Sequence, residues 1–285
     1  MNAKSLNYWS APNGLSGTVP ISDFLALAVR HRFEAVELCI FEEGVLHLGT
    51  TESEARAIRT QVEDAGLVVP STASGIYWSR SLGDPGEGVR AQAFDDLKRM
   101  LEISSWLGAK THLTIPGAVS VFFLPDRPVQ RYDEVYQRAQ DGLAALAPLA
   151  EDAGVTMAIE NVWNMFLLSP VEMVNFIDGI GSKFVGSYFD VGNILPYGYP
   201  QDWLRILGHR VAGVHFKDFR KSVGTENGFV DLLEGDVDFP AVMAAIQEIG
   251  YTGPVVAEMI PNYALYPEVR VANTSNAMDA ILGRK

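Results

Sequence analysis

Short apolar runs alternate with longer amphipathic stretches along the whole chain. Each apolar run ends in Gly, Pro or polar residues, and the stretch that follows repeats its apolar positions at helical spacing. The runs at residues 67–69 and 254–257 are continuously apolar, which is typical of parallel strands buried on both faces. The alternation occurs eight times and predicts eight strand–helix units.

The boundaries of these units follow from the pattern and from residues that begin or end helices. The predicted strands cover residues 4–9, 35–40, 67–73, 110–115, 156–160, 184–189, 211–216 and 255–258. The predicted helices cover residues 21–31, 52–65, 89–107, 133–153, 170–177, 200–207, 239–249 and 268–282. Glycines such as Gly108 and Gly154 stand where a helix should end before a strand, and Ser169 with Pro170 is typical of a helix start.

Strict alternation of strands and helices predicts right-handed crossovers and a parallel sheet. Eight units in 285 residues (285/8) average about 36 residues each, which is the size of the units in a (β/α)₈ barrel. We therefore predict an α/β protein with a single (β/α)₈ TIM barrel, in which residues 1–285 form one catalytic domain. A doubly wound open sheet is the alternative, but the chain has no Gly-rich phosphate-binding turn after an early strand.

Four successive predicted strands end in residues that bind metals. They supply Glu160, Asp190, His215 and Glu258, and the C-terminal ends of barrel strands form the active site. Three neighbouring carboxylates repel one another unless a cation holds them together. An oxygen-rich set with one nitrogen suits Mn²⁺, with Mg²⁺ or Co²⁺ as alternatives. The sequence thus predicts one divalent metal at the barrel mouth.

These residues resemble the xylose-isomerase-like superfamily of sugar isomerases and epimerases, and within it the ketose 3-epimerases of free ketoses and ketose 5-phosphates. The resemblance covers nearly the whole chain and is sharpest over residues 158–259. It implies that Glu160, Asp190, His215 and Glu258 bind one metal. It also implies that Glu160 and Glu258 form the acid/base pair.

The resemblance implies an isomerase of carbohydrate metabolism that epimerises a sugar or sugar phosphate beside a ketose carbonyl, through a cis-enediolate. One glutamate removes the proton next to the carbonyl and the other returns a proton to the opposite face. An aldose–ketose isomerase, or a lyase or dehydratase acting on a keto-sugar, keto-inositol or keto-glycoside, remains as an alternative. A non-catalytic sugar-binding barrel is disfavoured because all four ligands are present.

Two positions depart from the free-sugar epimerases. Phe166 stands where those enzymes place a substrate-binding glutamate, and Asn193 stands where they place a histidine. The specificity of those enzymes for free sugars is therefore not expected of this chain.

Several further residues are expected to contact substrate. They are Glu37, Asn193, Lys217, Trp163 and Arg220. Glu37 is expected to bind substrate hydroxyls or to support a residue of the site, and Lys217 and Arg220 are candidates for holding a phosphate or another anion. An apolar wall that keeps water from the reacting carbon is expected from aromatic residues, namely Trp9, Tyr77, Trp78, Trp163 and Phe166.

The net charge and the cysteine content bear on the partners and the cellular location of the protein. A formal net charge of −13 counts against nucleic acids and anionic membranes as partners. It therefore also counts against the function of a related endonuclease that acts on damaged DNA. Cys39 is the one cysteine, so no intrachain disulfide forms, and the first residues lack the apolar segment of a signal peptide. We expect a cytoplasmic enzyme with a small carbohydrate substrate, and the resemblance implies a homo-oligomer, either a dimer or a tetramer.

Overall fold

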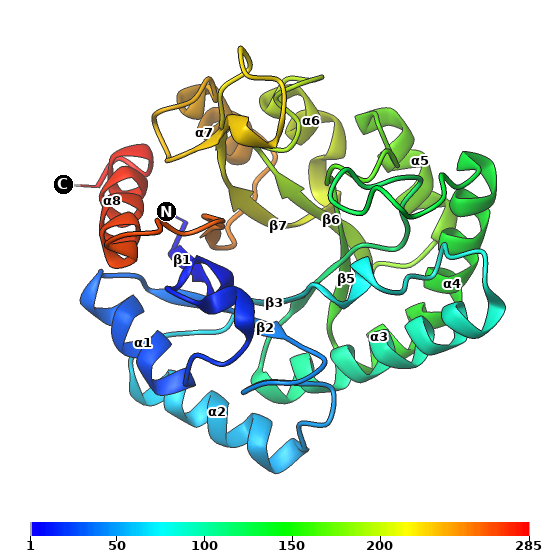
Figure 1. Cartoon of the computed structure of the whole chain (residues 1–285), viewed down its shortest axis with the longest axis horizontal. Helices are drawn as coiled ribbons and strands as arrows, with labels where there is room; N and C mark the ends of the chain where they lie inside the picture. The colour runs from blue at the N-terminus through cyan, green and yellow to red at the C-terminus, as the bar shows by residue number, and fades with distance from the viewer. Residues whose placement is uncertain (1, 285) are drawn as a thin grey trace.

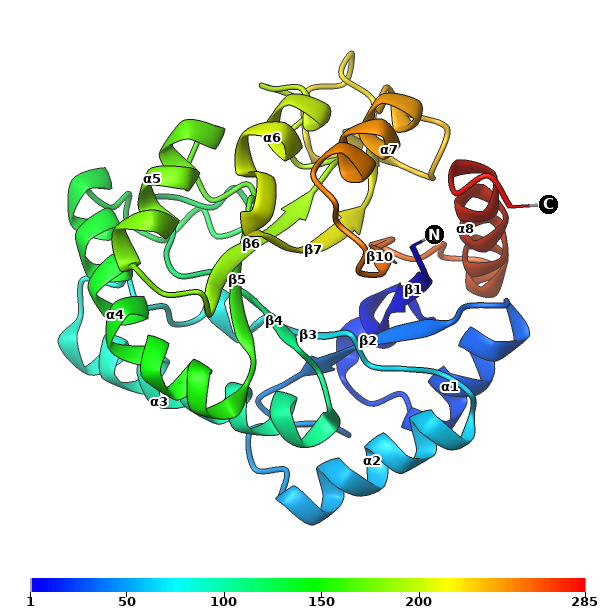
Figure 2. The same ribbon diagram turned by 180° about the vertical axis from the view of Figure 1, so that it is seen from behind.

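A computed structural model describes residues 2–284, and in them eight parallel strands close into a barrel surrounded by eight helices (Figure 1). Around the barrel the strands follow the order β1-β10-β7-β6-β5-β4-β3-β2. Figure 2 shows the same ring of helices from behind. The predicted TIM barrel is confirmed, and the open-sheet alternative is excluded.

All eight predicted strand–helix units are present. The barrel strands are β1 (Lys4–Asn7), β2 (Ala35–Ile40), β3 (Ser71–Ser74), β4 (Thr111–Thr114), β5 (Thr156–Glu160), β6 (Val185–Asp190), β7 (Val211–Phe216) and β10 (Val255–Ala257). The helices are α1 (Ile21–Arg30), α2 (Glu52–Asp64), α3 (Glu87–Leu107), α4 (Tyr132–Ala153), α5 (Pro170–Ile180), α6 (Pro200–Leu207), α7 (Phe239–Glu248) and α8 (Pro267–Ile281).

Most boundaries agree with the prediction to within a few residues, for local reasons. The side chain of Ser169 accepts a hydrogen bond from the Glu172 amide and so begins α5, and Gly154 ends α4 with a φ of 67°. The largest difference is β3, which begins four residues late. Pro70 precedes it and has no N–H to donate to a strand ladder.

None of the helices among the described residues is long and apolar enough to cross a bilayer.

A two-stranded antiparallel sheet, β8 (Asp218–Phe219) with β9 (Phe229–Val230), was not predicted. Strands of two residues are too short to produce a periodic pattern. The buried carboxylate of Asp218 accepts hydrogen bonds from four backbone amides, those of Phe219, Leu233, Gly235 and Val237. This carboxylate therefore shapes the loop between β7 and α7.

Strand residues alternate between the helices and the barrel interior. Phe216 contacts Phe239 of α7 on the outside, whereas Tyr188 and His215 have ring centroids 4.5 Å apart inside. Gly213 lies two residues before His215 on β7. A Cβ atom at position 213 would lie 2.5 Å from the Tyr188 ring, so glycine leaves the space that this ring fills.

The substitution Gly213→Ala is expected to lower the free energy of unfolding by about 1–3 kcal/mol, because the added methyl group must displace the packed Tyr188 ring. Urea unfolding measures this change. The matched control is Gly88→Ala on α3, where nothing lies within 4 Å of the added methyl group. Its stability should be unchanged or slightly higher. Equal stability of the two variants would contradict the packing argument.

Candidate metal centre and substrate pocket

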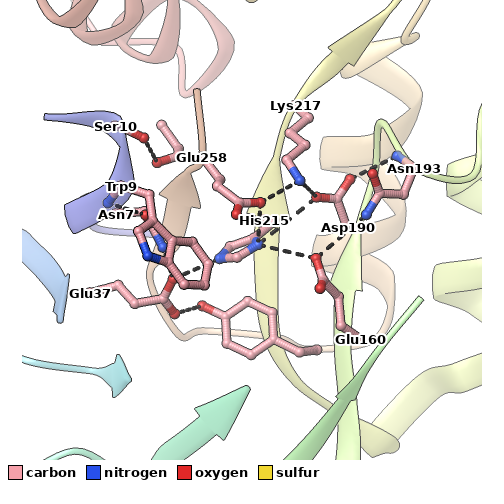
Figure 3. Close-up of polar contacts among 12 residues, drawn as sticks. Asn7, Trp9, Ser10, Glu37, Glu160, Asp190, Asn193, His215, Lys217 and Glu258 are labelled. Carbon is pink, nitrogen blue, oxygen red and sulfur yellow. Dashed lines mark hydrogen bonds and ion pairs between the residues drawn. The ribbon is translucent and has the colours of Figure 1, made fainter. Parts of the chain in front are cut away.

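The four predicted metal ligands lie together at one end of the barrel (Figure 3). Glu160 and Asp190 end β5 and β6, His215 is next to last on β7, and Glu258 directly follows β10. One ligand atom from each residue lies within 4.8 Å of those of the other three, and all four residues are buried. The cluster has the composition and size of a site that could hold one metal ion.

His215 is oriented by Glu37 of β2, a strand that β1 and β10 separate from β7 in the barrel wall. Nε2 of His215 lies 2.7 Å from Oε1 of Glu37, and both side chains are fully buried. The charge of His215 keeps the pKa of Glu37 below its usual value despite complete burial, so the carboxylate accepts and Nε2 donates. Nδ1 then faces the three carboxylates, at 3.6 Å from Glu160, 3.9 Å from Asp190 and 3.3 Å from Glu258.

Glu37 is itself held by three further donors. The Asn7 amide donates to Oε1 at 2.6 Å, and the hydroxyls of Ser71 and Tyr188 both donate to Oε2. Every oxygen of this buried carboxylate is thus satisfied, as a charge inside a protein requires. The sequence analysis left two roles open for Glu37, and its position beneath His215 favours support of the site.

Backbone and amide contacts position the remaining ligands. The Asn161 side chain and the backbone of Asp190 bond reciprocally, at 2.7 and 2.9 Å, and the backbone N–H of Asn193 donates to Oδ1 of Asp190 at 2.8 Å. At the end of β10, the Ser10 hydroxyl donates to the backbone carbonyl of the residue before Glu258 and accepts from the backbone N–H of the residue after it. Sequence reasoning did not single out Ser10, since this residue carries no recognisable metal-site signal.

Lys217 is the cation beside the cluster. Its Nζ lies 3.2 Å from Oδ2 of Asp190 and also contacts Oε2 of Glu258. Burial alone would raise the pKa of Glu258, but the positive charges of Lys217 and His215 outweigh this effect and lower that pKa to about 2. Burial raises the pKa of Glu160 to about 7, and it also raises the pKa of Asp190. His215 is also buried, yet Glu37 and Glu258 raise its pKa well above the usual value.

The ligand atoms themselves are poorly satisfied by protein hydrogen bonds. Within the described residues, Oδ2 of Asp190, Nδ1 of His215 and Oε2 of Glu258 are buried with no hydrogen-bond partner of good geometry. The two oxygens have only ion pairs, to the Lys217 ammonium and to the His215 ring. Buried polar atoms of this kind are rare in native proteins. These two oxygens and one nitrogen converge with a carboxylate oxygen of Glu160, and the resulting set of three oxygens and one nitrogen fits a divalent cation.

A pocket of about 860 Å³ opens above the cluster. Among the predicted substrate contacts, Asn193, Lys217 and Trp163 line it, together with Glu160 and Glu258. Glu37 lies below the cluster and outside the lining. Arg220 is exposed and donates to the backbone carbonyl of Glu234 at 3.0 Å, so the structure does not bring it into the pocket.

The apolar wall differs in part from the prediction. Trp9 and Trp78 line the pocket as expected. Tyr77 and Phe166 do not: the Tyr77 hydroxyl is buried 2.7 Å from Nε2 of His112, and Phe166 packs against aromatic rings of α4 and α5. Their places in the wall are taken by Phe122 and Phe123, which sequence reasoning missed because they lie in an irregular segment.

The support from Glu37 predicts that Glu37→Gln weakens Mn²⁺ binding by about 10–100-fold, because the neutral amide no longer holds His215 in its ligating orientation. Isothermal titration calorimetry measures the dissociation constant. Glu63→Gln, on the exposed face of α2, is the control and should bind Mn²⁺ like the parent protein. Unchanged Mn²⁺ affinity in Glu37→Gln would contradict the role of Glu37.

Known proteins resemble the chain along most of its length. The L-ribulose-5-phosphate 3-epimerase UlaE of Salmonella paratyphi C (strain RKS4594) is 26% identical over 260 residues, which cover 90% of this chain and 88% of UlaE. The crystal structure of a D-psicose 3-epimerase in the presence of D-fructose is 18% identical, with a TM-score of 0.77 and 99% of each chain covered. A structure of L-ribulose 3-epimerase is 17% identical, with a TM-score of 0.78, covering 99% of this chain and 95% of that one.

These relatives carry the names of sugar epimerases, and epimerases are isomerases. The structural likeness confirms the barrel over nearly the whole chain. The model of the xylose isomerase-like TIM barrel family matches residues 25–278. The chain therefore belongs to the xylose isomerase-like TIM barrel family.

Proposed function

We propose that this protein is a divalent-metal-dependent epimerase that inverts the carbon beside the carbonyl of a keto-sugar. The observation that carries the proposal is the buried cluster of Glu160, Asp190, His215 and Glu258 at the floor of a pocket large enough for a sugar. Membership of a family with named sugar 3-epimerases supports the reaction type.

The metal would be held by these four residues, with Mn²⁺ as our first choice because the donor set is rich in oxygen. A bound divalent cation polarises a carbonyl and stabilises the negative charge that develops on its oxygen. His215 would bind through Nδ1, the nitrogen that Glu37 leaves free. Glu37 thus completes a carboxylate–histidine–metal arrangement of the kind that orients histidine ligands.

Glu160 and Glu258 are proposed to move the proton. They line the same pocket from β5 and β10, strands that are separated by β6 and β7 in the barrel wall. A sugar bound between them would present opposite faces of one carbon to the two carboxylates. Inversion needs one group to remove the proton and another to deliver a proton from the other face, and the roles exchange in the reverse direction.

The pocket wall supports this chemistry. Trp9, Trp78 and Trp163 surround the floor and exclude water from a carbanion-like intermediate that water would protonate. Asn193 and Lys217 offer donors to sugar oxygens from the same floor. A cytoplasmic location and assembly as a dimer or tetramer stay predictions of the sequence.

Replacing either glutamate should abolish turnover. For Glu160→Gln and Glu258→Gln we expect kcat to fall by about 10²–10⁴-fold, since an amide neither takes nor gives the proton. Deuterium uptake from D₂O into a panel of ketoses and keto-sugars, with product analysis, measures the reaction and separates epimerisation from isomerisation or elimination. Metal content is measured in parallel, and Glu63→Gln is the control. Turnover by either variant close to that of the parent would overturn the assignment.

Metal binding should depend on pH. The pKa of Glu160 is raised to about 7 and that of His215 well above its usual value, so the metal must displace a proton from His215 and, below about pH 7, a second proton from Glu160. Lowering the pH adds these protons and weakens binding. We expect the apparent Mn²⁺ affinity to fall by about tenfold per pH unit for each proton displaced. Calorimetry at pH 6, 7 and 8 tests this, and an affinity independent of pH would contradict the proton displacement.

A further inference from the structure

Five aromatic rings line one side of the pocket in an unbroken series, here called the aromatic arc: Trp78, Phe123, Phe122, Trp163 and Phe229. Neighbouring rings in this order have centroids 5.1, 5.1, 6.0 and 5.1 Å apart. The rings come from the segments that follow β3, β4 and β5 and from β9. Four separate parts of the chain thus contribute to one apolar surface above the metal cluster.

The aromatic arc exposes more apolar surface than folding requires. Phe122 is 50% exposed and Phe123 is 47% exposed, although both pack against other rings. Adjacent exposed aromatic residues at the rim of a pocket are typical of a ligand-binding surface. The pocket volume of about 860 Å³ lies toward the upper end of the range of about 300–1,000 Å³ for drug-sized ligands. A monosaccharide at the metal cluster would not fill a pocket of this size, and it would leave the exposed rings of Phe122 and Phe123 available for a further group.

The charges of the pocket disfavour a phosphate. Within residues 2–284, the charged side chains of the lining are four carboxylates and one cation: Glu42, Glu160, Glu226, Glu258 and Lys217. The Lys217 ammonium is already paired with Asp190 and Glu258. Even with the two positive charges of a bound divalent cation, the carboxylates of this lining outnumber its positive charges, so a phosphate dianion would meet an excess of negative charge, and burying it unpaired is costly.

Arginines close to the mouth have other partners. Arg80 pairs with Asp96 and Glu42, and Arg127 pairs with Asp84 at 2.6 Å. Neither arginine is among the residues that line the main pocket. The sequence-based expectation of an anion held by Lys217 and Arg220 therefore finds no support in this geometry.

We propose that the substrate is an unphosphorylated keto-sugar with an apolar, ring-containing substituent, as in an aryl keto-glycoside. This inference rests on the proposed function for the position of the sugar at the metal cluster. The substituent lies against the aromatic arc, where it buries the exposed faces of Phe122 and Phe123. The apolar lining and the paired state of Lys217 exclude charged substituents from that region.

Three probes test the proposal on the full-length protein, both metal-free and loaded with Mn²⁺. They are phenyl 3-keto-β-D-glucopyranoside, the corresponding methyl glycoside, and L-ribulose 5-phosphate. Calorimetry gives binding affinities, and deuterium uptake from D₂O gives turnover. We expect the phenyl glycoside to bind roughly tenfold more tightly than the methyl glycoside, since aromatic contacts add to area burial. L-ribulose 5-phosphate should bind more weakly than both.

The double substitution Phe122→Ala with Phe123→Ala should abolish the preference for phenyl over methyl, because the phenyl group loses both rings that it contacts. Both rings are half-exposed, so the variant is expected to fold. Val129→Ala is the matched control, because Val129 is 75% exposed in the same segment and does not line the pocket.

The two hypotheses can fail separately. If the glycosides bind in the expected order but no probe takes up deuterium, the proposed function is wrong and the assignment of the aromatic arc stands. If the phosphate binds or reacts better than the phenyl glycoside, if the double variant keeps the preference, or if no glycoside binds, the inference on substrate class is overturned.

Discussion

The buried hydrogen bond between Glu37 and His215 is the interaction on which the site depends. It joins β2 to β7 through the barrel interior, across 178 positions of the sequence. Glu37 is fully buried as a carboxylate because Asn7, Ser71 and Tyr188 saturate its oxygens. With Nε2 committed to Glu37, the other nitrogen of His215 is directed at the three carboxylates. Barrel closure is thus a condition for the site's chemistry.

The same closure creates an electrostatic difficulty. Glu160, Asp190 and Glu258 approach one another in a buried region, where charges are poorly solvated. The structure meets this difficulty in two ways. Lys217 pairs with two of the carboxylates, and burial raises the pKa of Glu160 to about 7, so that this group is protonated in part at neutral pH. A cluster of this kind could hold a divalent cation, which would displace the protons that these groups carry.

The floor of the pocket bears on the type of reaction, and the wall of the pocket bears on the class of substrate. The floor contains the four residues that the family resemblance associates with metal and proton transfer, and the family model matches the chain across them. The wall is built from connecting segments, which vary more freely than strands because they carry little of the core. The aromatic arc belongs to this wall. The residues at the strand ends therefore bear on the type of reaction, whereas the residues of the loops bear on the class of substrate. A relative with the same type of reaction can act on a different class of substrate.

The sequence by itself determined the eight strand–helix units and the residues that end β5, β6, β7 and β10, because apolar periodicity and helix caps are local signals. Only the tertiary structure decided that Glu37 supports His215 and that Lys217 pairs with the cluster. It also decided that Arg220 stays outside the pocket lining, and that Phe122 and Phe123 line the pocket whereas Tyr77 and Phe166 do not. These outcomes depend on contacts between residues far apart in the chain and on irregular loops. No periodic pattern encodes such contacts, since they form only when the barrel closes and brings the loops to one mouth.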